Sequence, residues 1–296
     1  MNLSKTQSLI LLHCIILIWG FTGVLGKLID MPSTFIVWNR MLIAFFSLFI
    51  INILIYKKTF PHTKKALFNY LFIGTLITIH WICFFEAIKQ STVSLALICL
   101  SSISLFTSIL EPLIQKRKIL IYELLLSILV IIGILIIYKH ENIYNNAIIL
   151  AVTSAFFGAL FTVLNHKLIK TGHKAMIITT WEMFGGMFLL TIYLILTKEL
   201  NIEIIPTGNN IIYILILALI CTAFAFSVSI EIMKKITPFT VNLSVNLEPI
   251  YAIILALLIF GENEKMSTEF YFGATIIIFS ILLNTFVKKK KVAKNN

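Results

Sequence analysis

The sequence predicts an all-α, polytopic membrane protein with ten transmembrane helices, arranged as two inverted halves of five helices. Three observations support this prediction: an apolar composition, ten apolar stretches of helix length, and an internal repeat. Hydrophobic residues make up 59% of the 296 residues and charged residues only 12%, whereas about a quarter of the residues in soluble domains are charged. The apolar runs are continuous over about twenty residues, which indicates helices rather than the shorter, alternating strands of a membrane β-barrel.

Each apolar stretch is long enough to cross a bilayer core about 30 Å thick, which takes about 20 helical residues. Short connections separate the stretches, which cover residues 8–29, 34–56, 66–88, 92–114, 119–138, 145–169, 175–197, 210–233, 238–260 and 270–287. We interpret the first stretch as a span rather than a signal peptide, because it has no small-residue cleavage site. The four cysteines lie in these stretches without metal-ligand spacing, so we expect no metal site and no cofactor.

The net charge of +11 comes from basic residues that cluster in alternate connections between the spans. Clusters such as Lys64-Lys65, Lys116-Arg117-Lys118 and Lys288-Lys289-Lys290-Lys291 fall on the side that also bears both termini. By the positive-inside rule this side is the cytoplasm. Membrane orientation therefore explains the charge, and we expect no nucleic-acid partner. Frequent use of Ile, Lys and Asn indicates an AT-rich bacterial genome, and hence a bacterial inner membrane as the location.

An internal repeat divides the chain near its middle. The segment Ile36-Val37-Trp38-Asn39-Arg40 aligns with Thr179-Thr180-Trp181-Glu182-Met183 at an offset of 143 residues. Further on, Glu86-Ala87-Ile88-Lys89 aligns with Glu231-Ile232-Met233-Lys234 at an offset of 145. We therefore predict two repeats, residues 1–143 and 144–296. Because each repeat has an odd number of spans, the second enters the membrane in the opposite orientation, an arrangement typical of secondary transporters.

Several motifs occur along the chain in a characteristic order: Trp19-Gly20 with Gly23, Arg40, Ser91-Thr92-Val93-Ser94-Leu95-Ala96, Leu247-Glu248-Pro249, and Phe260-Gly261-Glu262. Together they resemble the EamA-type members of the drug/metabolite transporter superfamily, over essentially the whole chain. The resemblance implies ten helices, two inverted repeats, and the export or uptake of small metabolites such as amino acids. The first half departs from the family pattern at Ser104, where a proline is usual, and at Lys116-Arg117.

Polar and aromatic residues inside the spans are the candidates for a substrate site. A charged side chain within a span costs about 3 kcal/mol or more, so it faces protein or a water-filled cavity. The candidate substrate-binding or cavity-lining residues are Trp19, Arg40, His80, Trp81, Ser101, Trp181, Glu182, Asn246, Glu248 and Tyr251. For the neutral polar residues among them, hydrogen bonding between helices is the alternative role. We expect a cavity with a polar centre and aromatic walls, lined by spans 1–4 and 6–9, with spans 5 and 10 peripheral.

Each of the three charged candidates has a structural alternative. Arg40 either offers its guanidinium fork to a substrate carboxylate, or it reaches the outer headgroups or pairs with an acid such as Glu86. Glu182 either binds a cation or proton in the cavity or is a protonated structural carboxyl. Glu248 either couples transport to protons or bonds backbone groups that Pro249 leaves free.

We expect a secondary transporter that moves a small metabolite by alternating access, and specifically an exporter. The chain contains no G-x-x-x-x-G-K-[ST], H-E-x-x-H or G-x-S-x-G motif, which argues against an ATP-driven pump and against the common hydrolase classes. We therefore expect no enzyme activity. Two alternatives stay open: a membrane enzyme acting on a lipid-linked substrate, and a pore-forming or structural subunit. The expected partners are a small-molecule substrate, the lipid bilayer and, for coupled transport, protons, in a monomer or homodimer.

The predicted topology can be tested with reporter fusions. A fluorescent protein fused after Asn296 should fold and emit in the cytoplasm, and alkaline phosphatase inserted within residues 139–144 should be active in the periplasm, because the basic connections face the cytoplasm. Phosphatase activity at the C-terminus, or fluorescence from an insertion at 139–144, would overturn this orientation.

Overall fold

The computed structural model describes residues 3–57 and 59–294 of the chain. Within this part the fold is all-helical, with 84% of residues in helices and no strand. Nine helical segments of the described chain are long and apolar enough to cross a membrane, and they coincide with the first nine predicted spans. The tenth predicted span falls in α13 (Thr268–Lys294), whose apolar part among the described residues, Thr268–Ser280, is shorter. The number of ten spans therefore stays a prediction, and the side chains of the Lys288-Lys289-Lys290-Lys291 cluster lie outside the described part.

Five spans are uninterrupted helices: α1 (Lys5–Leu28), α3 (Lys64–Gln90), α6 (Ile121–His140), α7 (Asn145–Lys170) and α8 (Ala175–Leu196). Two spans contain π-helix: α2 (Ser33–Ile51) ends in η1 (Asn52–Tyr56), and α9 (Asn209–Leu215) continues through η4 (Ile216–Phe224) into α10 (Ala225–Ile232). Two more are interrupted, as α4 (Val93–Leu100) is followed by α5 (Ile103–Gln115), and α11 (Pro238–Val245) by α12 (Glu248–Phe260). The 3-10 turns η2 (Asn142–Tyr144), η3 (Ile202–Ile204) and η5 (Gly261–Glu264) lie in connections.

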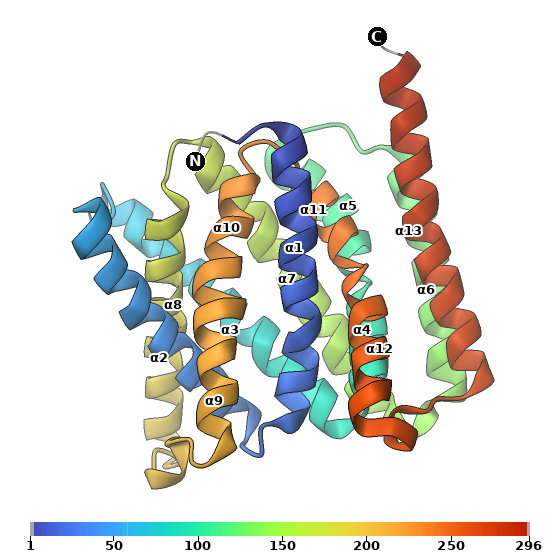
Figure 1. The fold of residues 1–296 in the computed structure, drawn as a ribbon. Coiled ribbons are helices and arrows are strands. Elements are labelled where there is room, and N and C mark those ends of the chain that lie inside the picture. The colour runs from blue at the N-terminus through green and yellow to red at the C-terminus, as the bar shows by residue number, and fades with distance from the viewer. Residues whose placement is uncertain (1–2, 58, 295–296) are drawn as a thin grey trace.

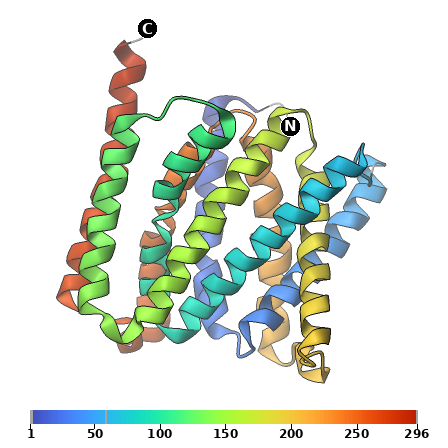
Figure 2. The same ribbon diagram turned by 180° about the vertical axis from the view of Figure 1, so that it is seen from behind.

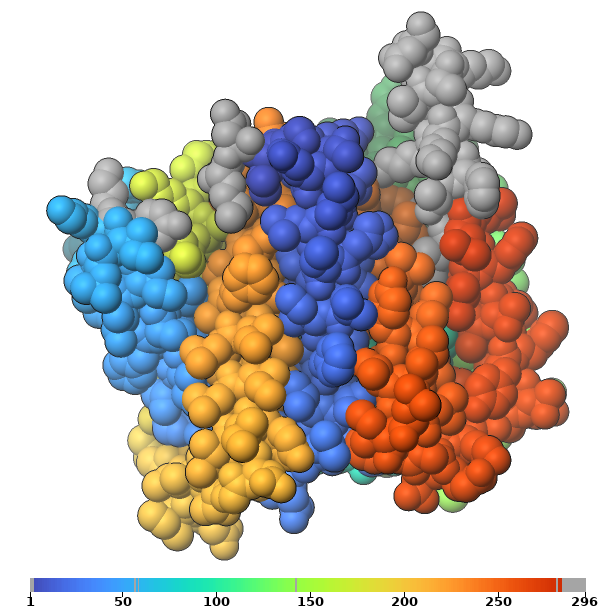
Figure 3. Space-filling model, viewed as in Figure 1, coloured from blue at the N-terminus to red at the C-terminus, as the bar shows by residue number. Residues whose placement is uncertain are grey.

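The helices form one bundle with both chain ends on the same side (Figure 1). α6 and α13 pack together at one edge, and α2 and α8 lie at the opposite edge (Figure 1, Figure 2). With side chains filled in, α1 lies between the α9–α10 segment and α12 and covers the centre of the bundle from that direction (Figure 3). On the outside, Leu54, Leu196 and Leu258 are 71%, 76% and 77% exposed. Large exposed apolar side chains of this kind are expected on a surface that contacts lipid.

The two interrupted spans have the same layout at an offset of 145 residues. In each, a threonine caps a helix of 8 residues, two residues form a turn, and a helix of 13 residues follows. The caps are alike as well, since the Thr92 side chain accepts from Leu95 N and the Thr237 side chain accepts from Thr240 N. Such caps satisfy backbone donors at the first turn of a helix.

The break in the second of these spans differs from the proline kink that the sequence predicts. The helix ends before Pro249, which lies in the first turn of α12, where its missing N–H leaves no acceptor unpaired. In the first half no proline is present at the break. There the Ser102 hydroxyl donates to the Cys99 carbonyl at 2.9 Å, and the Ser104 hydroxyl donates to the Ser101 carbonyl at 3.2 Å. Serine hydroxyls thus bond the carbonyl groups that the turn exposes.

These spans run side by side, α4 against α12 and α5 against α11. Two amide side chains join them near the breaks: Asn246 Nδ2 donates to Ser104 Oγ at 3.0 Å, and Asn242 Nδ2 donates to Thr107 Oγ1 at 2.8 Å. Interhelical hydrogen bonds of this type help to hold helices together in a membrane, because apolar side chains gain little from contacting another helix instead of lipid.

Each interrupted span also begins at a carboxylate from the other. The two oxygens of Glu264 accept from Val93 N and Ser94 N, each at 3.0 Å, at the start of α4. In the same way Glu111 of α5 accepts from Phe239 N at 2.8 Å, at the start of α11. A carboxylate is favourable there because the first backbone N–H groups of a helix carry partial positive charge. The two contacts lie at opposite ends of the bundle (Figure 1).

Glycines permit the close approach of α3 and α8. A Cβ atom added at Gly185 would lie 2.7 Å from Leu71 Cα and 2.8 Å from the Leu71 carbonyl oxygen. These are backbone atoms that cannot move aside without shifting the helix, so the packing distance between the helices depends on the missing side chain.

We predict that Gly185→Ala separates α3 from α8 and lowers the free energy of unfolding by about 1–3 kcal/mol, as overpacking of a tight interface does. Thermal denaturation of the purified protein in detergent measures the effect. Phe188→Ala on the same helix is the control, because Phe188 is 54% exposed and its removal should change the midpoint little. Equal midpoints for Gly185→Ala and the wild-type protein would contradict the prediction.

Candidate functional site

A cavity lies in the centre of the bundle, between α1, α2, α3, the two interrupted spans, α7 and α10. The centre of a water molecule can move through about 80 Å³ of it. Its polar wall consists of Thr22, Arg40, His80, Thr162, Asn165, Ser229, Asn242 and Glu248. Its apolar wall consists of Trp19, Trp81, Phe84, Leu100, Ile103, Phe161, Phe226, Ile230, Met233, Val241 and Val245. Among the described residues, α6, α8 and α13 contribute none of the lining. α6 and α13 correspond to spans 5 and 10, which we expected to be peripheral. α8 corresponds to span 7, which we expected to line the cavity but which does not.

Arg40 is the cationic group of this wall, and its side chain is only 2% exposed. Its Nε donates to Thr222 Oγ1, and its guanidinium carbon lies 3.8 Å from the centre of the Trp81 ring. Stacking on an aromatic face partly replaces the hydration that burial removes. Glu86, considered above as a partner for Arg40, instead accepts from the Ser33 hydroxyl at 2.7 Å. Because Nη1 of Arg40 has no partner among the described residues, the guanidinium group retains a donor for a ligand.

The π-helix η4 supplies the acceptor that orients Arg40. Within it, the Thr222 hydroxyl donates its proton to the Leu217 carbonyl, five residues back, at 2.7 Å. Its lone pairs are therefore available to Arg40. The same segment accepts from Trp19, whose Nε1 donates to the Cys221 carbonyl at 3.0 Å. A π-helical turn interrupts the regular hydrogen-bond ladder and frees such groups, which is why π-bulges often occur at functional sites.

Glu248 is the carboxyl group of the wall and the first residue of α12. It also lines a smaller cavity between the two helix breaks, together with Ser101 and Asn246. No ion pair within 4.0 Å joins Glu248 to Arg40, both of which lie in the described part of the chain. The site therefore presents a guanidinium group and a carboxyl group that do not contact each other directly.

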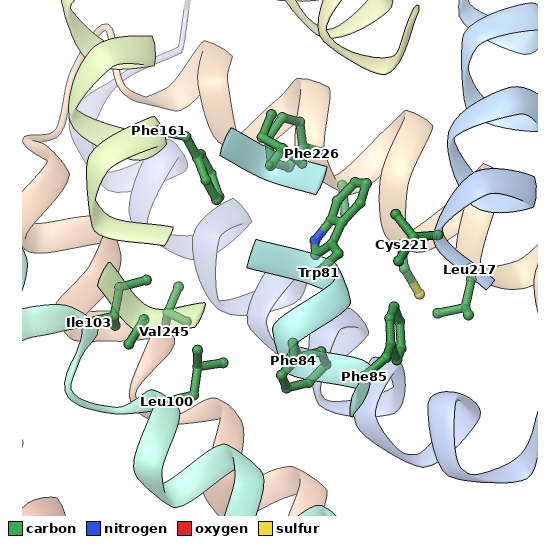
Figure 4. Packing of buried hydrophobic residues seen from close by; sticks show 14 of the residues in the cluster. Trp81, Phe84, Phe85, Leu100, Ile103, Phe161, Leu217, Cys221, Phe226 and Val245 are labelled. Atoms are coloured by element: carbon green, nitrogen blue, oxygen red, sulfur yellow. The ribbon is translucent and has the colours of Figure 1, made fainter. Parts of the chain in front are cut away.

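Aromatic side chains form one side of the cavity. Phe226 lies between Trp81 and Phe161, with ring centres 6.0 Å and 5.6 Å apart. Figure 4 shows these three rings on one side and Leu100, Ile103 and Val245 as a separate aliphatic group.

His80 stands beside the aromatic rings in the cavity wall. Its Nδ1 is bonded to Ser154, both at the carbonyl and at the hydroxyl, each at 2.8 Å. The bonds to one residue of α7 fix the orientation of the imidazole ring within the wall.

The structure brings most of the predicted site residues together. Trp19, Arg40, His80, Trp81 and Glu248 line the central cavity. Ser101 and Asn246 line the smaller cavity, which Glu248 shares. The remaining three, Trp181, Glu182 and Tyr251, line neither cavity.

Two of the aromatic residues expected at the cavity wall, Trp181 and Tyr251, lie outside it because their side chains contact other parts of the protein. Trp181 Nε1 donates to the Thr59 carbonyl at 2.7 Å, beyond the end of α2. Tyr251 packs against α1, so that a Cβ atom at Gly20 would lie 3.1 Å from Tyr251 Cβ. Tyr251 therefore supports the packing of α12 on α1 rather than the cavity wall.

Glu182 is completely buried on α8, and its carboxyl group interacts with the side chain of Asn165. Asn165 lies beside it on α7 and also lines the central cavity. Glu182 is thus separated from the cavity by one amide side chain.

Several lining residues carry little signal in the sequence. Asn165 could have been found, since it is a polar residue between Thr162 and His166 in the middle of an apolar span. Phe161 and Phe226 could not, because the chain contains 24 phenylalanines and most of them pack in the core or face lipid. No group of three or more His, Cys, Asp or Glu side chains that could hold a metal ion occurs in the described chain.

A family model described as "EamA-like transporter family" matches the chain twice, over residues 6–139 and 145–286. The chain belongs to this family. A protein of Clostridium kluyveri described as an uncharacterized transporter is 24% identical over 212 residues, which cover 69% of this chain and 67% of that protein. A solved crystal structure superimposes with a TM-score of 0.72 at 12% identity, over 96% of this chain and 99% of that one, and so shares the fold. The EamA-like chain is therefore a multi-pass membrane transporter.

We predict that Thr222→Val destabilises this EamA-like protein, because it keeps the shape of the side chain but removes the acceptor of Arg40 Nε. Leaving a buried donor unpaired costs about 1–3 kcal/mol, and the free energy of unfolding should fall by that amount. Thermal denaturation in detergent measures it, with Thr222→Ser as the control that retains the hydroxyl. A Thr222→Val protein as stable as Thr222→Ser would show that the bond contributes nothing.

Proposed function

We propose that this EamA-like protein is a secondary carrier that exports a small metabolite, an amino acid or a related compound, across the bacterial inner membrane by alternating access. One observation carries the proposal: a central cavity between two interrupted spans has the guanidinium group of Arg40 and the carboxyl group of Glu248 in its wall. Cavities at discontinuous helices are where secondary transporters bind their substrates.

The proposed architecture has ten spans, with repeats 1–143 and 144–296 in inverted orientation and both termini in the cytoplasm. Two findings support the repeat: the family model matches twice, and the breaks of the α4–α5 and α11–α12 spans recur at a constant offset. The basic connections on the side of the termini support the orientation.

The proposed substrate is a zwitterion. The guanidinium group of Arg40, oriented by Thr222 and Trp81, suits a carboxylate, which it binds through paired donors. Glu248 suits an ammonium group at the other charged position of the same wall. The aromatic and aliphatic residues between them accommodate a small apolar side chain.

Alternating access would use the two contacts between the interrupted spans as gates. Glu264 joins η5 to the start of α4 at one end of the bundle, and Glu111 joins α5 to the start of α11 at the other. Opening one contact while the other persists would expose the cavity to one side only. Glu264 accepts three charge-assisted hydrogen bonds from Val93 and Ser94, and Glu111 accepts one from Phe239 N. Each such bond contributes about 1.5–3 kcal/mol, so conformational changes can break and re-form the contacts.

Of the two candidate residues for proton coupling, we favour Glu248 over Glu182, because Glu248 lines the cavity and Glu182 does not. The same carboxylate would bind either a proton or the substrate ammonium group. Because the proton and the substrate compete for the Glu248 carboxylate, the carrier would exchange one for the other. A proton that binds from outside would displace the substrate outward and then move inward. This reasoning supports export as the direction.

Saturable counterflow in proteoliposomes loaded with a mixture of amino acids tests the carrier function. We predict that Arg40→Lys raises the half-saturation concentration about tenfold or more, because a charge-assisted bond of about 1.5–3 kcal/mol is lost with the fork. Arg117→Lys, the same change outside the cavity, keeps the positive charge beside Glu111 and Glu123 and should leave the half-saturation concentration unchanged. Flux that never saturates would instead indicate a pore. Turnover of a lipid-linked substrate without any counterflow would indicate a membrane enzyme.

The coupling role of Glu248 is tested by Glu248→Gln, which keeps volume and hydrogen bonding but cannot exchange a proton. We predict that this variant loses substrate accumulation driven by a pH gradient. Counterflow, which needs no net proton movement, should persist with a raised half-saturation concentration, because the amide oxygen can still accept a hydrogen bond from the ammonium group but carries no charge. Glu262→Gln is the control, because the Glu262 side chain is 81% exposed. Undiminished accumulation by Glu248→Gln would show that Glu248 is structural. A wild-type protein indifferent to the pH gradient would be a facilitator.

A further inference from the structure

A second concavity lies away from the central cavity, between the first half of α3 and the last turns of α7. The centre of a water molecule can move through about 480 Å³ of it, several times the space in the central cavity. Figure 2 shows α3 and α7 side by side at the face of the bundle that is turned to the viewer. We call this concavity the α3–α7 groove. It lies at the end of the bundle that bears both termini.

The rim of the α3–α7 groove is basic. Lys65 on α3 and Lys167 on α7 line it and are exposed. Neither ammonium group has an ion pair or hydrogen bond among the described residues, and no acidic residue lines the groove there. The rim also contains the hydroxyl groups of Thr63, which accepts from Ala66 N, and Thr171, which donates to the Leu168 carbonyl.

His173 completes the rim as a neutral group. It is bonded to the hydroxyl of Tyr70, which ties the connection between α7 and α8 to α3. Burial, reinforced by the neighbouring His62, lowers the pKa of the His173 imidazole, so the ring is uncharged at pH 7. The positive charge of the rim therefore comes from the two lysines.

Below the rim and Asn69, which lies one turn below Lys65, the groove is apolar. Ile73 and Phe72 line it on α3, and Leu164 lines it on α7. Phe72 is 50% exposed. From Lys65 to Phe72 the helix rises about 10 Å, and from Lys167 to Leu164 about 4.5 Å. On both helices the charge lies nearer to the end of the bundle and the apolar surface nearer to its middle.

This order of charge and apolar surface matches a phospholipid, whose charged headgroup lies at the membrane surface and whose chains extend into the core. We propose that the α3–α7 groove binds one anionic phospholipid, with its phosphate between Lys65 and Lys167 and an acyl chain along Phe72 and Leu164. Basic pockets between transmembrane helices on the cytoplasmic side are suited to acidic lipid headgroups. A bound lipid would connect α3 to α7 at this end of the bundle, alongside the link from Tyr70 to His173.

Titration of the purified full-length protein with phosphatidylglycerol tests the proposal, with binding followed by native mass spectrometry and by the thermal midpoint. Phosphatidylglycerol should bind and raise the midpoint, whereas phosphatidylcholine should not. Each lysine near an anionic headgroup contributes about a factor of five in affinity. The double variant Lys65→Gln/Lys167→Gln should therefore raise the dissociation constant about 25-fold. Lys64→Gln/Lys174→Gln removes the same charge from residues outside the groove and should change it less than about twofold.

Two further measurements distinguish the binding of a lipid from the binding of a small anion. Phe72→Asn disrupts the chain-binding surface without changing the charge, and it should weaken phosphatidylglycerol binding. Inorganic phosphate supplies the charge without the chains and should not raise the midpoint at millimolar concentration. Equal lipid retention by Lys65→Gln/Lys167→Gln and the wild-type protein would overturn the proposal. Stabilisation by phosphate equal to that by phosphatidylglycerol would also overturn it, since the groove would then be a site for small anions.

Discussion

Helix breaks inside a membrane must have their hydrogen-bonding groups satisfied by the protein itself, because the bilayer core offers none. Both interrupted spans of this transporter meet that requirement by lying against each other. Asn242 and Asn246 of α11 and its turn bond hydroxyl groups of α5, while Glu111 and Glu264 bond the backbone at the helix starts. Neither span could leave the other without exposing these groups to lipid, and the centre of the bundle is built around this pair.

The substrate site depends on the same constraint. Because the breaks place Glu248 at the start of a helix rather than within one, its carboxyl group lines the cavity. Arg40 faces the same space, oriented by an acceptor that the π-helix η4 frees. Irregular backbone thus positions both charges. Irregular backbone is tolerated at this depth because it is enclosed by protein and lines a cavity.

The structure also separates two kinds of charge. Arg40 and Glu248 face a central cavity, where charges are costly and function gives the reason to retain them. The lysines lie at the ends of the bundle, most of them at the end that bears the termini, where headgroups and water surround them and the cost is small. Lys65 and Lys167 belong to this second group, but the apolar groove below them distinguishes them from neighbours such as Lys64.

Hydrophobicity along the chain determined the fold class and nine of the predicted spans, because a helix that crosses a bilayer is specified by its own length and composition. It also pointed to Arg40 and Glu248, because a charged residue inside an apolar stretch can be recognised from the sequence alone. What the sequence left open is the direction in which each side chain points. Glu182 stood out in the sequence as clearly as Glu248 did, yet it lies behind Asn165.

The sequence by itself determined which segments cross the membrane, the repeat pattern and the family, because these follow from local composition and motifs. Only the tertiary structure decided that a pair of turns interrupts the repeated spans, that Trp181 and Tyr251 lie outside the cavity, and that Phe161 and Phe226 line it. The physical reason is that nearly every face of these helices is apolar. A helix that could face lipid or protein with similar free energy is oriented by its neighbours, through hydrogen bonds and close contacts between residues far apart in the chain.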